Sequence, residues 1–490
     1  MNSSLNAVYR VVWNAAKGVW QAVSEIGKAC GKGKTFRALK LVNNSALLVA
    51  VAVSPVAMAQ GLPTNGSVVA GQASISQSGN QMTVKQTSDR AAIDWQSFNV
   101  GQGKSVDFVQ PTSQSVALNR VLGSDVSVIQ GRINANGQVF FVNPNGILFT
   151  PDAQVNTSGL VASTQNISTA DFIAGKYTFS GNSRAAVTNQ GKITAAPGGT
   201  VALIAAKIIN AGQITADKGN VLMGAGNTVV LDLGGPVKIQ VKEGALNAAI
   251  EQSGGIRANG GLVYLTAKAA GDLASTVINH TGITQAQTLT TGEKGEIYLM
   301  GGMENDAIQV SGTLDASAPQ KGDGGFIETS AATVKLNKPH TVTTKASQGK
   351  TGTWLIDPND YTIAATNGNI TGAQLGTNLA SNNVTISTSN QGTAGGNGDI
   401  FVKDNVSWSS GNTLTLNAER NIKINATLDA SQGSGGKVAL NYKVLTEIKT
   451  AIMRSVPILM LSIQSAGTTV QALSLLVFIA RQDSMGVLMV

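Results

Sequence analysis

The chain contains very little cysteine and histidine. Among its 490 residues there is one cysteine, Cys30, and there are two histidines, His280 and His340. Cys30 lies in a segment that we expect to be removed, so the mature chain would have no disulfide framework and no thiol nucleophile. Two histidines are too few for a histidine-rich metal site, and the sequence has no phosphate-binding glycine loop. We therefore expect a protein that is not an enzyme and that needs no cofactor or metal.

Aromatic and charged residues are also scarce, at 4% and 13% of the chain, whereas glycine is abundant. This composition is not typical of a compact enzyme. The formal net charge of +8 lies at the two ends, because residues 1–60 contribute +6 and residues 441–490 contribute +2. Since the segment between them is neutral, the basic pI does not indicate a nucleic-acid partner, and we expect none.

A secretory signal pattern is present near the N-terminus. Residues 28–40 are basic, an apolar segment follows, and Ala57 and Ala59 are the small residues of a cleavage site, so cleavage is predicted after Ala59. A transmembrane anchor is the alternative, but the apolar run 46–59 is shorter than the ~20 residues that a span needs, and Pro55 interrupts it. The residues before this pattern exceed what an ordinary signal requires. They resemble the extended signal region of very large secreted proteins of Gram-negative bacteria.

Residues 61–440 consist of short segments with alternating apolar positions, each bounded by Gly, Asn, Asp or Ser. This pattern is typical of β-strands, and helical periodicity is nearly absent. Residues 189–195 (NQGKITA) are echoed by residues 210–216 (NAGQITA), a shift of 21 residues. A period near 20 predicts a solenoid of stacked coils rather than a globule.

Each coil of such a solenoid is expected to point Val, Ile and Leu inward and Thr, Ser, Gln and Lys outward, with bends at Gly or Asn. The predicted fold is therefore all-β, a parallel β-helix that follows the N-terminal signal region. A stacked array of β-sandwiches is the alternative. Leucine-rich repeats and propellers would require a leucine spacing or a Trp-Asp signature that this sequence lacks.

The most distinctive text lies in residues 91–150. It comprises IDWQSFNV at 93–100, which includes Trp95 and Phe98, then Asn119 and Arg120, then GQVFFVNPNGI at 137–147. In sequence and order it resembles the secretion domain of the filamentous haemagglutinin and high-molecular-weight adhesin family. The resemblance implies a right-handed parallel β-helix, passage through the Sec translocon, and capture by an outer-membrane two-partner transporter that has periplasmic recognition domains.

The residues Asn143, Pro144, Asn145, Gly146 and Ile147 are predicted to form a turn and enter the next strand. Proline presets φ at the second turn position, and Asn and Gly tolerate the left-handed geometry that follows. The resemblance implies that this turn also takes part in transporter recognition. A purely structural role and a recognition role both remain open at this point.

Four parts are expected along the chain: an extended signal peptide at 1–59, a two-partner secretion domain at 60–310, further β-helix repeats of an adhesin rod at 311–440, and an atypical tail at 441–490. Residues 353–363 resemble a segment found beyond the secretion domain in such adhesins and favour that branch. The tail lacks the repeat, which predicts a frameshift or a truncation. A native C-terminal cap is the alternative.

The predicted function is a secreted or surface-exposed adhesin or exoprotein of a Gram-negative bacterium, exported via the periplasm, of which this chain is an N-terminal fragment. Its further partner would be a receptor on a host cell or another bacterium. A delivery stalk for a contact-dependent toxin or cytolysin is the alternative, and a β-helix enzyme acting on polysaccharide is a third. The carboxylate pair Asp357 and Asp360 is assigned to turn chemistry, and His280 to a solvated repeat turn.

Overall fold

The computed structural model describes residues 61–442 apart from 235–236, 272–274, 391–395 and 432–434, together with a few short strands nearer the two ends. Two of these, β1 (Tyr9–Asn14) and β2 (Val19–Ser24), pair antiparallel within a unit that spans Met1–Val56. A second unit, Ala57–Val490, holds all other described elements. The expected cleavage residues Ala57 and Ala59, and most of the tail, lie outside the described residues.

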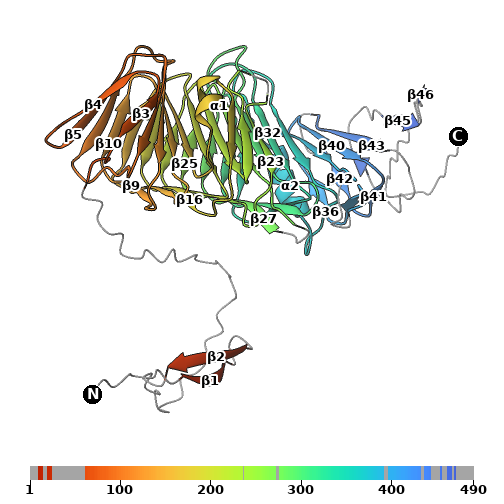
Figure 1. Cartoon of the computed structure of the whole chain (residues 1–490). Coiled ribbons are helices and arrows are strands. Elements are labelled where there is room, and N and C mark those ends of the chain that lie inside the picture. Colours follow the sequence, from red (N-terminus) through yellow and green to blue (C-terminus); the bar gives the residue numbers. More distant parts are fainter. Residues whose placement is uncertain are drawn as a thin grey trace, which may run out of the picture. The chain divides into compact units, whose positions relative to one another are not determined.

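In the second unit the chain winds into stacked coils (Figure 1). Each regular coil contributes one strand to each of three long sheets, which have 8, 11 and 16 strands. One coil supplies, in that order, β16 (Ala186–Asn189), β17 (Lys192–Ala195) and β18 (Thr200–Ala205), and the next supplies β19 (Lys207–Asn210), β20 (Gln213–Thr215) and β21 (Asn220–Ala225). Equivalent strands of these coils pair in parallel. The architecture is a right-handed parallel β-helix, which confirms the predicted fold class.

The predicted repeat appears directly in the strand register. Asn189 pairs with Asn210 and Ile193 with Ile214, a shift of 21 residues. The period is not constant, because Asn220 pairs with Leu262, which lies 42 residues further on. The additional residues form β22 (Thr228–Leu231) and β23 (Ile239–Glu243), which leave the coil. A period near 20 therefore describes only the shortest coils.

Most strands bury alternate residues, as predicted. In β26 (Leu262–Ala267), Val263 and Leu265 point into the coil and are fully buried, whereas their neighbours are half-buried. Equivalent aliphatic residues stack from coil to coil into one continuous core. Burial of this apolar surface is the main stabilising contribution in such a stack.

A polar ladder also lies inside the β-helix, where three coils turn. The Nδ2 of Asn189 donates to Oδ1 of Asn210 at 2.8 Å, and the Nδ2 of Asn210 donates to Oε1 of Gln252 at 2.8 Å. All three residues are buried, and the hydrogen bonds offset the cost of burying their amides.

His280 continues this ladder, and its predicted solvated position is wrong. It ends β27 (Ser275–His280), pairs in register with Gln252 and is 0% exposed. Its Nε2 lies 2.8 Å from Oγ1 of Thr284, and burial lowers the pKa of the ring to about 4. The sequence around His280 is typical of a turn, so it does not indicate that this side chain points into the β-helix.

A second layer covers part of the 16-stranded sheet. It consists of α1 (Thr169–Ile173) with β15 (Tyr177–Ser180) and of β22 with β23, and β15, β22 and β23 form an antiparallel sheet. Beneath it, β11 (Gln138–Val142), β14 (Gly159–Ser163) and β18 are buried on both faces. The expected outward polar residues are therefore replaced here by apolar ones, such as Phe140, Ala202 and Leu222.

The first coil is closed by a hairpin, in which β4 (Ala73–Ser78) and β5 (Gln81–Gln86) pair antiparallel at the end of the 11-stranded sheet. A terminal element of this kind shields a sheet edge that would otherwise offer free backbone groups.

Further along, α2 (Gly372–Leu379) begins with a capping box between Thr371 and Gln374. The 16-stranded sheet continues through residues 311–440, so the coils expected there belong to the same stack.

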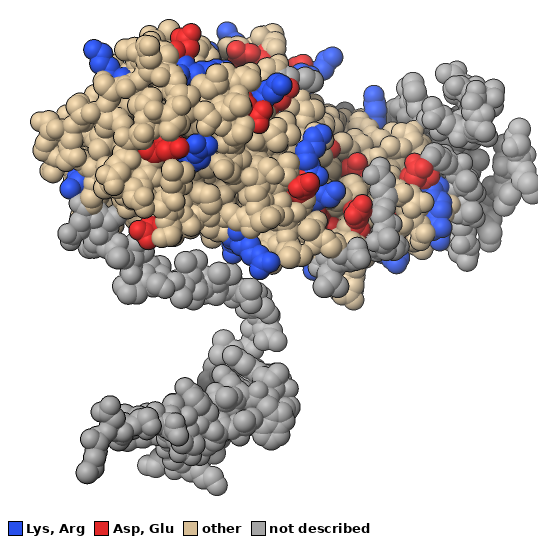
Figure 2. All heavy atoms as spheres, in the orientation of Figure 1, with Lys and Arg blue, Asp and Glu red and all other residues tan. Residues whose placement is uncertain are grey.

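Charged side chains are few and intermixed on the face that Figure 2 shows, in agreement with the neutral charge of the central segment. Among the described residues, no helix is both long and apolar enough to cross a bilayer.

Candidate functional site

The predicted turn joins β11 to β12 (Ile147–Phe149) and is anchored by Asn143. Asn143 is 0% exposed. Its Nδ2 donates to the backbone oxygen of Asp125 at 2.9 Å and to Oγ of Ser127 at 2.8 Å, on the preceding coil. Its Oδ1 accepts from the backbone N–H of Asn145 at 2.9 Å, which closes an Asx-type turn. Asn143 therefore fixes both the turn and its position against the neighbouring coil.

The remaining turn residues continue this attachment. The Nδ2 of Asn145 donates to the backbone oxygen of Gly123 at 2.7 Å, and Oγ of Ser183 donates to that of Pro144 at 2.6 Å. Gly146 has φ +118°, a conformation that residues with a side chain rarely adopt. Ile147 enters the core at 1% exposure. These hydrogen bonds hold residues 143–147 in the turn and attach the turn to its neighbouring loops.

Three of the distinctive family residues are core residues that support the same coils. Trp95 and Phe98 are each 1% exposed and pack edge to face, with ring centroids 5.4 Å apart. Phe98 also contacts Phe141, at 4.6 Å between ring centroids. The indole N–H of Trp95 donates to Oδ1 of buried Asn119 at 3.0 Å. These residues shape the interior beneath the turn rather than a surface.

Arg120 attaches the second layer to the coil. Its guanidinium donates to both carboxylate oxygens of Asp94, at 2.9 and 3.0 Å, and to the backbone oxygen of Ile167 at 3.4 Å. Arg90, which the sequence analysis did not select, acts in the same way: it donates to the backbone oxygen of Phe172 at 3.0 Å and to the hydroxyl of Tyr177 at 2.7 Å. Arg120 was selected from the sequence only through the family resemblance, and the attaching role of both arginines was not predicted, because the segment that they hold leaves the repeat.

Three apolar residues are exposed at the turn and in the loop beside it, where Ser124 and Asp125 are exposed as well. Pro144 is exposed, and the loop that accepts hydrogen bonds from Asn143 and Asn145 is flanked by Leu122, at 64% exposure, and Val126, at 45%. Neither Leu122 nor Val126 was predicted to be exposed, because an apolar residue at the end of an alternating segment looks like another core position. We refer to Leu122, Val126 and Pro144 as the turn patch.

The carboxylate pair assigned to turn chemistry separates in the structure. Oδ1 of Asp360 accepts backbone N–H groups of Asn397 and Asp399 at 2.9 and 2.8 Å, as a turn residue does. Asp357 instead ends β35 (Thr353–Asp357), one strand away from Glu328 on β32 (Phe326–Ser330). Burial and then the charge of Glu328 raise the pKa of Asp357 to about 6.

Among the described residues, no three His, Cys, Asp or Glu side chains are grouped to hold a metal ion.

Comparison with known families decides the class of protein. The family model described as the TPS secretion domain matches residues 59–316, more than half of the chain. The chain belongs to the TPS secretion domain family. The extended signal peptide of the type V secretion system matches residues 6–74, in front of and overlapping this TPS domain. The predicted class is confirmed: this is a secreted or cell-surface exoprotein of a Gram-negative bacterium that leaves the cell via the periplasm, and its TPS domain implies an outer-membrane two-partner transporter.

Two curated proteins are similar in sequence to part of this chain. A heme/hemopexin-binding protein of Haemophilus influenzae strain Rd is 36% identical over 226 residues, which cover 43% of this chain and 24% of the relative. Another protein of that name from Haemophilus influenzae is 46% identical over 100 residues, 20% of this chain and 11% of the relative. The chain thus matches a quarter or less of the length of these relatives.

A solved structure agrees with the fold. The crystal structure of the HMW1 secretion domain from Haemophilus influenzae superposes with a TM-score of 0.59 at 24% identity, covering 80% of this chain and 98% of that one. This likeness supports the β-helix of the TPS domain.

Proposed function

We propose that the turn patch is a surface by which the periplasmic domains of the two-partner transporter recognise the folded coil or its emerging segment. The observation that supports the proposal is the division of roles at the turn. Asn143 is buried and bonded within the coil, whereas Leu122, Val126 and Pro144 expose apolar side chains beside it. Exposed apolar groups at the centre of a contact supply most of the affinity of protein interfaces.

The division of roles allows recognition to be separated from folding. Replacing both Leu122 and Val126 by serine changes exposed side chains, so the free energy of unfolding should change little. Export into the medium should fall at least about fivefold, because the apolar contact with the transporter is lost. Export is measured as the fraction of the chain outside the cell, and stability as the urea midpoint of the purified protein.

A matched control is available on the same chain. Leu246 and Ile283 are also exposed, at 67% and 57%, and lie away from the turn. The double serine variant at these positions should be exported like the unmodified chain. Equal export of the turn-patch variant and this control would sink the recognition role and leave the turn purely structural.

Asn145 gives a complementary measurement. Alanine at this position removes the bond to Gly123 and should lower both the urea midpoint and export. Unimpaired export by a destabilised Asn145→Ala protein would contradict any role of the turn in secretion.

We also propose that the extended signal directs the chain through the Sec translocon before the transporter recognises it. After export, the coils display a binding surface to a receptor on a host or bacterial cell. The alternative of a toxin stalk requires an effector further along the complete gene, and reading that gene distinguishes the two. We do not extend haem or hemopexin binding to this chain: within the described residues His280 is buried, and His340 is bonded to Asn337 and Asn378.

A further inference from the structure

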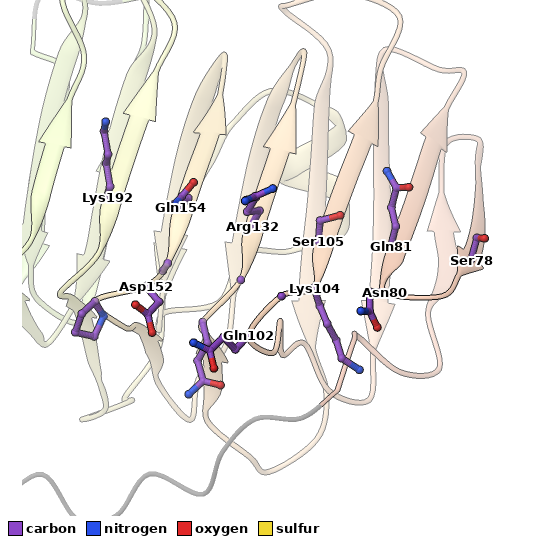
Figure 3. A pocket seen from close by; sticks show the side chains of 15 residues that line it. Ser78, Asn80, Gln81, Gln102, Lys104, Ser105, Arg132, Asp152, Gln154 and Lys192 are labelled. Carbon is purple, nitrogen blue, oxygen red and sulfur yellow. The ribbon is translucent and has the colours of Figure 1, made fainter.

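A groove of about 780 Å³ lies at the N-terminal end of the 11-stranded sheet (Figure 3). It crosses the turns that lead into the strands of this sheet that come earliest in the chain. Gln81, Ser105, Arg132, Gln154 and Lys192 form a row along it, one from each of five successive strands, and Lys104, Gln102 and Asp152 come from the turns below. No residue of the turn patch lines this groove, so it is a separate feature of the secretion domain.

The floor of the groove is rigid, because paired backbone holds each coil to the next. The backbone N–H of Arg132 donates to the oxygen of Lys104 at 3.0 Å, and that of Lys192 donates to the oxygen of Ala153 at 2.9 Å. Equivalent positions on neighbouring coils are about 4.8 Å apart, so Arg132 and Lys192, two strands apart, are separated by roughly 10 Å. Side chains on such a backbone are presented at fixed intervals.

The groove has a local excess of positive charge although the central segment is neutral. Lys104, Arg132 and Lys192 line it with one acid, Asp152. A second acid, Asp107, lies beside the row and accepts from Nε2 of Gln81 at 2.7 Å and from Oγ of Ser105 at 3.0 Å, so three cations stand against two acids. None of the three cations takes part in the salt bridges between described residues, which join Arg120 to Asp94, Arg257 to Asp217, and Arg420 to Asp399. Their guanidinium and ammonium groups therefore remain available for an anionic ligand.

The rest of the lining restricts the class of that ligand. Amide and hydroxyl side chains dominate the walls, and no aromatic side chain lines the groove. A peptide partner would usually need apolar anchors, and a single-stranded nucleic acid would need aromatic stacking platforms. Amides and hydroxyls can instead exchange hydrogen bonds with a chain of sugar hydroxyls, and the spacing of the coils is similar to the length of one sugar unit.

From this arrangement we infer that the groove binds an acidic oligosaccharide. Arg132 and Lys192 pair with carboxylate or sulfate groups on sugars about two coils apart, and Gln154 bonds to a hydroxyl of the unit between them. Lys104, which precedes the strand on the other side of Arg132, approaches the next unit in that direction. Gln81 and Ser105, which donate to Asp107, accept hydrogen bonds from sugar hydroxyls there. The ligand is recognised by its anionic groups and its hydroxyls together.

The test uses the full chain purified from the culture medium, so a failure of binding does not bear on its export. Binding is measured by biolayer interferometry to immobilised oligogalacturonate, to a heparin-derived oligosaccharide, to uncharged dextran and to single-stranded DNA. We expect binding to one or both acidic sugars, distinguishing carboxylate from sulfate, weak or no binding to dextran and DNA, and an affinity that falls as salt is raised.

The matched variants assign the binding to the groove. Exchanging both Arg132 and Lys192 for glutamine should weaken binding at least about tenfold, since two charge-assisted contacts are lost. Replacing Lys207 and Lys335, which lie on the 8-stranded sheet, by glutamine removes the same charge and should leave the affinity unchanged. The inference is overturned by no binding to either acidic sugar, by equal loss in both double variants, or by DNA binding as tight as that of the sugars.

Discussion

Single polar residues inside the coils hold this fold in register, and Asn143 shows the effect most clearly. Its amide bonds to Asp125 and Ser127 on one side and to Asn145 on the other, and both Asn143 and Ser127 are buried. An alanine there would remove the bond to buried Ser127 and the two part-buried bonds to the backbone of Asp125 and Asn145. A buried group left without a partner costs about 1–3 kcal/mol.

We therefore expect Asn143→Ala to lower the free energy of unfolding by roughly 2–3 kcal/mol. The control is Asn156→Ala, because Asn156 is exposed and its amide bond to Asn134 is long, at 3.4 Å. Urea unfolding followed by circular dichroism gives both values. Identical midpoints for the two variants would refute the anchoring role of Asn143.

His280 makes a second prediction at this scale. Its folded-state pKa, about 4, is below the ordinary value of 6.5, so the folded protein takes up the proton less readily than the unfolded chain. Stability is complete above pH 6.5 and is lost as the pH falls towards 4, by up to roughly 3 kcal/mol. Asp357, with its pKa raised to about 6, acts in the opposite direction over an overlapping range.

The contribution of His280 to the pH dependence is therefore measured as the difference in unfolding free energy between the unmodified chain and His280→Gln. Glutamine keeps a polar amide in the ladder. The variant should lose less stability than the unmodified chain between pH 6.5 and 4. Parallel stability curves over this range would show that His280 does not control the acid response.

At the scale of elements, the second layer is the main departure from a simple solenoid. Phe140 projects from β11 towards it and contacts Phe172 and Tyr177, with ring centroids 5.8 and 4.9 Å apart. Truncation of Phe140 to alanine should cost about 3–5 kcal/mol, as expected for a buried aromatic residue. Phe401, which is only half-buried, provides the matched control and should cost clearly less on the same change. Thermal unfolding of both proteins decides the matter, and a similar loss in each would contradict the proposed packing.

The sequence predicted the coils better than the insertions. The echo at 189–195 and 210–216 appears as paired strands because its Asn and Gly mark the same bend twice. The segments that form α1, β15, β22 and β23 alternate or cap like any other short element, so nothing local shows that they fold back over a sheet. For the same reason His280 could not be placed, since inward and outward turn residues have similar neighbours in sequence.

The site was predictable in part. The turn at 143–147 was found from its Asn-Pro-Asn-Gly text, whereas Leu122 and Val126 depend on which loop lies beside it in space. That contact joins residues about a coil apart, and a single sequence gives no register between coils. The salt-bridged Arg120 was selected only through the family resemblance, and its partner Asp94 became evident only from the geometry.

At the scale of the whole molecule, the described part of the second unit is a stack in which each coil contacts its neighbours. Folding of such a stack can start at one end and propagate. The described coils contain no cysteine, so no disulfide has to form or break during passage through the periplasm. Both features suit a protein that leaves the cell via the periplasm.

The most direct test of this account is export with and without the transporter. The full chain is expressed in a Gram-negative host, alone or with its two-partner transporter, and the fraction of the chain in the medium is measured by immunoblot. The account predicts that the chain stays in the periplasm without the transporter and appears in the medium when it is present. Equal amounts in the medium under both conditions would contradict export by the two-partner route.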